Sequence, residues 1–136
     1  MNPGDAVVLL GAYLLGPGYG AAAAGVGSAM ADLLLGSAIY APATLLIKAG
    51  MAVTAGALYR RMKGTPVGVL LCGAVGEVPM VAGYWLYDAL LLRSFTGSVA
   101  GVPSNLMQAI FGVAASTLLA LALRKSSYVR RRFPAL

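Results

Sequence analysis

Long apolar runs that carry almost no charge limit what this chain can fold into. Of its 136 residues, 60% are hydrophobic and 10% are charged, and the mean hydropathy is +0.83. A typical soluble domain is about 25% charged, and no soluble core in so short a chain could bury this much apolar surface. The sequence therefore predicts an all-α integral membrane protein.

Breaks in the apolar pattern divide the chain into about five transmembrane helices. The expected helices are residues 5–16, 17–35, 42–59, 66–92 and 102–123, with a loop of small polar residues at 94–101. Pro17 suits the first turn of a helix, and the segment before it is long enough for about half a bilayer core. Residues 1–125 are then one transmembrane helical domain, and residues 126–136 are a basic cytoplasmic tail.

Two groups of basic residues set the expected orientation. Arg60, Arg61 and Lys63 lie between two expected helices, and the second group lies within residues 124–132, after the last one. The positive-inside rule places both groups, and hence the C-terminus, on the cytoplasmic side of the cell membrane. Five crossings would leave Met1 outside, so we expect a further helix before it.

Residue types that the sequence lacks exclude several chemistries. There is no histidine, and Cys72 is the single cysteine. Zinc hydrolysis, Ser-His-Asp catalysis and a disulfide framework are therefore excluded in their usual forms. The sequence has no GxxxxGK[ST] loop and does not bind ATP by that route. We expect no enzyme, no metal site, no cofactor and no nucleic-acid partner.

Ionisable and amide side chains within the apolar segments fall at a similar depth. Charged groups inside a membrane span are costly and mark functional sites, although Lys48 could extend outward to the interface and Glu77 could be protonated. Asn105 and Gln108 are three residues apart and share a helix face. Polar groups from several helices, open to the outside, suit a pocket for a polar small molecule. The residues in the outer half are Asp32, Lys48, Tyr84, Asp88, Asn105 and Gln108, and Glu77 lies nearer the middle of its helix.

Several of these residues also have a purely structural interpretation. Asp32 could cap or pair near a turn, and Asp88 could form an interfacial ion pair with Arg93. Asn105 could cap the last expected helix. The aromatic residues within 84–87 could form a belt at the outer interface.

Four segments carry a recognisable order of motifs: GVGSAMADLLLG, YAPATLLIKAG, GEVPMVAGYWLYDALLL and VPSNLMQAIFGV. In this order they resemble the substrate-binding S components of energy-coupling factor (ECF) vitamin transporters. The resemblance covers residues 4–123. The start, GDAVVLLGAYLLGPGYG, is similar to the family's second helix and the turn into its third, so the family's first helix is absent.

The resemblance implies a six-helix bundle, here without its first helix, in a bacterial cell membrane. Such a protein captures a vitamin or vitamin precursor from the outside, a riboflavin-type ligand as the first choice and a hydroxymethylpyrimidine or thiamin-type ligand as the second. It works with a transmembrane T component and two ATPase subunits, which hydrolyse the ATP. The absent helix predicts either a start at an internal methionine or a degenerate, truncated copy.

The resemblance also implies which residues would bind the ligand. Asn105 and Gln108 would offer donors and acceptors to the edge of a heterocycle. Tyr40 and Tyr84 would stack on a planar ring, and Lys48 would hold an anionic or carbonyl group. The matching positions are Asp32, Tyr40, Lys48, Glu77, Tyr84, Asp88, Asn105 and Gln108.

Two other classes of function stay open from the sequence. One is a small autonomous proton-coupled carrier, in which Glu77 would exchange protons. The other is a membrane subunit without a ligand, in which the small-residue faces are surfaces for partner proteins. An enzyme is the weakest hypothesis, because no pair of nucleophile and base can be identified.

Overall fold

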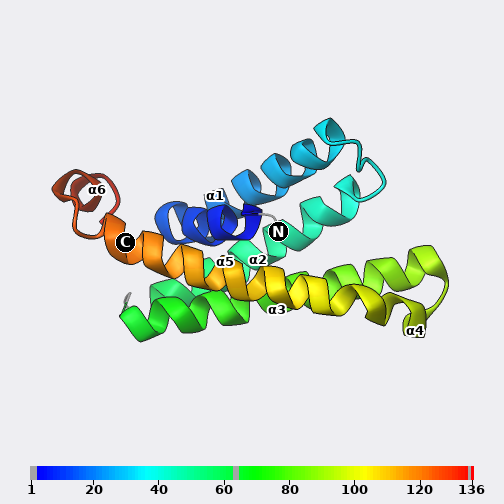
Figure 1. Cartoon of the computed structure of the whole chain (residues 1–136). Coiled ribbons are helices and arrows are strands. Elements are labelled where there is room, and N and C mark those ends of the chain that lie inside the picture. The colour runs from blue at the N-terminus through cyan, green and yellow to red at the C-terminus, as the bar shows by residue number, and fades with distance from the viewer. Residues whose placement is uncertain (1–2, 63–64, 135) are drawn as a thin grey trace.

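Helices form nearly all of the protein, whose computed structural model describes residues 3–62, 65–134 and 136. Within these residues there is no strand, and four helical stretches are long and apolar enough to cross a membrane. This confirms the all-α membrane class. Figure 1 shows α1 lying along α2, with α3 and α5 side by side. The elements are α1 (Gly4–Leu34), α2 (Ala41–Arg61), α3 (Pro66–Leu92), α4 (Phe95–Ser98), η1 (Val99–Gly101), α5 (Val102–Leu123) and α6 (Ser127–Arg132).

A break at Gly16 divides α1 into a first arm, residues 4–15, and a second arm, residues 17–34. Gly16 has φ +79° and ψ 177°, which only glycine adopts readily, and Pro17 disfavours a helical residue before it. A Cβ on Gly20 would lie 2.9 Å from the Cα of Ala12. In an unbroken helix, residues eight apart are about 12 Å apart along the axis, so the chain folds back at Gly16.

This fold-back explains the number of spanning helices. The sequence places a helix boundary at Gly16–Pro17, and the break lies there. The two expected helices are nevertheless joined in one element, α1, so four stretches rather than five meet the length and hydropathy of a membrane span. The first arm is about 18 Å long at the usual helical rise, which agrees with the expected half-span.

The other helices begin where their sequences predict. Proline in the first turn starts α2, α3 and α5, and the Thr65 hydroxyl accepts a hydrogen bond from the Gly68 N–H at 3.0 Å. Residues 94–101 are not a plain loop but contain α4 and η1, because Ser94 caps a short turn by accepting from the Gly97 N–H. Asn105 does not cap α5, which begins three residues earlier.

Small residues allow close helix contacts inside the bundle, where a few large side chains such as Tyr13 and Met51 are also buried, and many large apolar residues lie outside. A Cβ on Gly25 would lie 2.7 Å from the backbone oxygen of Leu45, so α1 and α2 are in close contact. Close helix approach of this kind holds membrane helices together. Large side chains such as Leu46 (71% exposed) and Leu118 (70% exposed) cover the exterior. The charged residues Asp5, Lys48 and Glu77 lie inside, which is the reverse of a soluble protein and suits a lipid environment.

One end of the bundle, here called the basic end, carries both expected groups of basic residues. The Arg124 guanidinium donates to the Tyr59 hydroxyl at 2.6 Å, and that hydroxyl donates to the backbone oxygen of Leu136 at 2.9 Å. Arg60 follows Tyr59 directly, so the end of α2 and the end of α5 lie together. Lys63 belongs to the first group but lies outside the described residues.

The fold-back at Gly16 generates a prediction about stability. Replacing Gly16 with alanine forces a side chain into a glycine-only conformation, so Gly16→Ala should lower the free energy of unfolding by about 1–3 kcal/mol. The matched control is Gly18→Ala, because a Cβ at Gly18 meets nothing within 4 Å. Thermal unfolding of both variants in mild detergent, followed by circular dichroism, checks this. Equal losses would show that Gly16 is not special.

Candidate functional site

A cavity of about 680 Å³ lies between the two arms of α1 and the neighbouring helices α2, α3 and α5. Its volume falls within the range of about 300–1,000 Å³ that is usual for small-molecule sites. Leu35, Tyr40 and Asp88 line it at the end of the bundle away from the basic end. Its polar lining residues are Ser28, Asp32, Tyr40, Thr44, Lys48, Tyr84, Asp88, Asn105 and Gln108.

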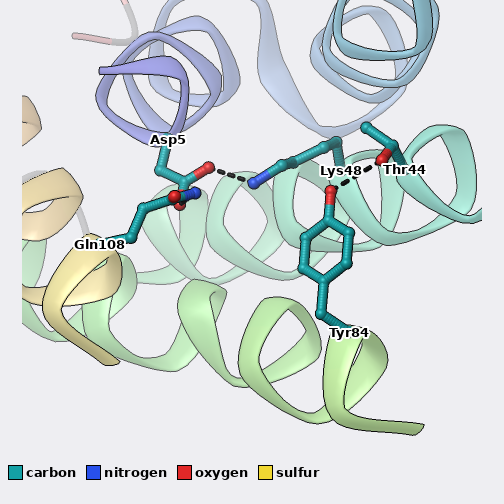
Figure 2. Close-up of polar contacts among 5 residues, drawn as sticks. All are labelled: Asp5, Thr44, Lys48, Tyr84 and Gln108. Atoms are coloured by element: carbon teal, nitrogen blue, oxygen red, sulfur yellow. Dashed lines mark hydrogen bonds and ion pairs between the residues drawn. The ribbon is translucent and has the colours of Figure 1, made fainter. Parts of the chain in front are cut away.

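Asp5, which is fully buried, joins three helices at one side of this cavity. One carboxylate oxygen of Asp5 pairs with the ε-ammonium of Lys48 from α2. The other accepts a hydrogen bond from the side-chain amide of Gln108 on α5 at 2.7 Å. Figure 2 shows Asp5 between these two side chains. Lys48 is therefore neutralised by a partner that the sequence did not point to.

Features of the local sequence place Asp5 at the start of α1 and let α5 approach it closely. Asp5 lies in the first turn of α1, where the helix dipole favours a carboxylate. Gly112 lets α5 approach, because a Cβ there would lie 2.8 Å from the Cβ of Asp5 and 2.7 Å from a carboxylate oxygen of Glu77. A larger residue at 112 would push α5 away from α1.

Tyr40 and Tyr84 line the part of the cavity that lies farther from the basic end. The hydroxyls of Thr44 and Tyr84 are hydrogen-bonded at 2.8 Å, and the Lys48 ammonium lies 5.4 Å from the centre of the Tyr84 ring. Figure 2 shows Tyr84 reaching from α3 toward α2. Tyr84 is thus a lining residue of the cavity.

Tyr40, directly before α2, connects the α1–α2 turn to α3. Its hydroxyl donates to a carboxylate oxygen of Asp88 at 2.9 Å. This hydrogen bond to Asp88, followed by partial burial, raises the pKa of Tyr40 above its usual value of 10.0. Asp88 therefore pairs with a tyrosine, and among the described residues it forms no ion pair with Arg93.

Two further lining residues keep polar groups available. Asp32 lies near the end of the second arm, and its Oδ2 is buried without a hydrogen-bond partner among the described residues. Asn105 lies in the first turns of α5 and also lines the cavity. An unpartnered buried acceptor is costly, so a ligand that donates a hydrogen bond to Asp32 gains from it.

Glu77 does not line this cavity, although its carboxylate lies near Asp5 at Gly112. It is 3% exposed, and neither carboxylate oxygen has a hydrogen-bond partner among the described residues. It lines a separate groove of about 910 Å³ between α3 and α5, whose other lining residues are apolar. Such a groove has few groups that could orient a polar ligand, so the cavity along α1 is the better candidate site.

The structure thus brings seven of the eight expected site residues to one cavity. The seven are Asp32, Tyr40, Lys48, Tyr84, Asp88, Asn105 and Gln108, and Glu77 is the exception. Their role in binding stays a prediction. Asp5 was missed, although its place at the start of an apolar helix was a signal that it needs a partner.

Comparison with known proteins gives the family. The family model described as "ECF-type riboflavin transporter, S component" matches residues 1–125. A relative from Pyrococcus woesei, named "Uncharacterized protein in gap 3'region", is 39% identical over 115 residues, which are 83% of this chain and 74% of the relative. No solved structure matches the chain.

The buried pair generates a prediction about stability. Lys48→Met leaves Asp5 as a buried charge without its ammonium partner, which should lower the free energy of unfolding by about 3–5 kcal/mol. Lys125→Met, at an exposed lysine after α5, is the matched control and should change it little. Adding Asp5→Asn to Lys48→Met removes the orphaned charge and should recover part of the loss. Denaturant unfolding in detergent checks all three, and no recovery in the double variant would contradict the pairing.

Proposed function

The chain belongs to the family of ECF-type riboflavin transporter S components, and from this premise we propose that it captures riboflavin from outside the cell. It is a multi-pass membrane protein of a vitamin-uptake family. The observation that carries the proposal is the 680 Å³ cavity with polar groups contributed by all four long helices. The riboflavin ring system is planar and has donors and acceptors along one edge, which suits this combination of tyrosine and amide side chains.

The positions of the side chains support specific roles. Tyr84 is held by Thr44 and offers its ring as a stacking surface. Asn105 offers an amide to the edge of the ring, and Gln108 offers the acceptor oxygen that its hydrogen bond to Asp5 leaves free. The hydroxyls of the ribityl chain would donate to Asp32 and Asp88.

Orientation and partners complete the proposal. The positive-inside rule places the basic end, with Arg60, Arg61 and Arg124, in the cytoplasm and Tyr40 and Asp88 on the outer side. The sequence has no Walker loop, so uptake would draw on ATP hydrolysed by two ATPase subunits, coupled through a T component. We expect inactive ATPases to abolish uptake into cells while leaving binding to this chain intact.

Binding to the purified protein is the direct test. Riboflavin fluorescence should be quenched saturably when the protein in mild detergent is titrated, because stacking on Tyr84 quenches the flavin. Asn105→Ala should weaken binding at least about tenfold, since a hydrogen-bonded polar contact is worth about 1.4 kcal/mol or more. Met107→Ala, at an exposed position of the same helix, should bind as the wild type does.

The alternative outcomes identify other functions. Binding of a hydroxymethylpyrimidine or thiamin-type compound in place of riboflavin would keep the class and change the substrate. A protein that binds no vitamin in a panel would contradict the proposal and favour a ligand-free membrane subunit. In that case Asn105→Ala would change assembly or stability only.

Substitution of Glu77 distinguishes the proposed function from that of a proton-coupled carrier. The buried carboxylate of Glu77 would suit proton exchange in such a carrier. Glu77→Gln removes the exchangeable proton of the acid but no hydrogen bond or ion pair seen for it in the described residues. We expect riboflavin binding within about twofold of the wild type and no loss of stability, because desolvating an unpartnered carboxylate is costly. Proton-coupled flux through the protein alone in vesicles, lost in Glu77→Gln, would contradict this.

A further inference from the structure

The charges around the cavity indicate which ligands the site disfavours. Lys48 is the one basic side chain among the described residues that line it. It is 5% exposed and pairs with Asp5, which is fully buried. Its positive charge is therefore already compensated before any ligand arrives. Of the two groups that the sequence-based expectation gave to Lys48, an anionic and a carbonyl group, this compensation favours the neutral carbonyl.

The remaining charged lining residues are carboxylates. Within the described part of the chain, Asp32 presents an oxygen without a hydrogen-bond partner, and Asp88 accepts only from the Tyr40 hydroxyl. With Lys48 and Asp5 cancelling, these two acids give the cavity an acidic balance. An anionic ligand there would meet like charges in a partly desolvated space, which costs several kcal/mol.

We propose, resting on the proposed function, that the cavity is built for the neutral, hydroxyl-bearing flavin and rejects its 5′-phosphate, with Asp5 as the positioning residue that sets this selectivity. Asp5 acts through Lys48, whose ammonium it neutralises and holds. The hydroxyl groups of a neutral side chain donate to Asp32 and Asp88. A phosphate in the same place has no free cation to meet.

Asp5→Asn isolates this effect. Asparagine keeps a side-chain oxygen that accepts from Gln108 but removes the charge that neutralises Lys48. Lys48 then loses its paired counter-charge, with Glu77 as the remaining carboxylate that acts on it, and its ammonium becomes available to a phosphate. The double variant Asp5→Asn/Lys48→Met removes both charges and frees none, so it is the matched control.

The experiment measures the dissociation constants of riboflavin and of flavin mononucleotide for the full chain in mild detergent. In the wild type, flavin mononucleotide should bind at least about 100-fold more weakly, as a like-charge penalty of several kcal/mol implies. Asp5→Asn should narrow that ratio at least about tenfold, and the double variant should return it to within about threefold of the wild type. Asp32→Asn should also narrow the ratio of the two dissociation constants, and it leaves the Asp5–Lys48 pair unchanged. It therefore gives a second test if Asp5→Asn folds poorly.

Each other outcome overturns a definite statement. Wild-type protein that binds both flavins within about threefold overturns the proposed selectivity while leaving the proposed function standing. An unchanged ratio in both Asp5→Asn and Asp32→Asn shows that the phosphate is rejected by size rather than charge, and overturns the role of Asp5. Wild-type protein that binds neither flavin overturns the proposed function instead.

Discussion

The contact between Asp5, Lys48 and Gln108 is the interaction on which the interior of this protein depends. Removing charged groups from water is expensive, and only close pairing with additional hydrogen bonds offsets the cost. Here both carboxylate oxygens of Asp5 have partners, one on α2 and one on α5. The start of α1 is thereby fixed to two other helices in a protein whose remaining interior contacts are largely apolar.

Close packing sets the shape around this contact. The fold-back at Gly16 lays two arms of α1 beside each other, and α2 closes onto the break through Gly56, where a Cβ would lie 3.0 Å from the nitrogen of Pro17. The second arm lines the cavity largely with small residues such as Ala23, Gly27 and Ala31, whose side chains leave space beside the first arm. Small residues thus have two effects in this bundle: they let helices approach closely, as at Gly25 and Gly56, and elsewhere they leave the cavity open.

Local signals in the sequence predicted most of the fold. Prolines and basic residues mark helix ends, so the bounds of α3 and α5 and the break at Gly16–Pro17 followed directly. The partners of Asp5 did not, because they lie 43 and 103 residues away and depend on how helices pack. Glu77 and Tyr84 are seven residues apart and so lie near one face of α3. Because α3 contacts both α2 and α5, the two residues nevertheless line different cavities.

The polar contacts of the cavity differ in strength with depth, and this bears on how a ligand enters. The Asp5–Lys48 pair is almost wholly buried, so breaking it would leave charges without water. The Tyr40–Asp88 contact lies where both residues are partly exposed, and water can replace it at little cost. Under the proposed function, a ligand that enters past Tyr40 would exchange this weak contact first and would meet the buried Asp5–Lys48 pair last. That order favours a preformed site, in which affinity is not reduced by the cost of rebuilding the interior.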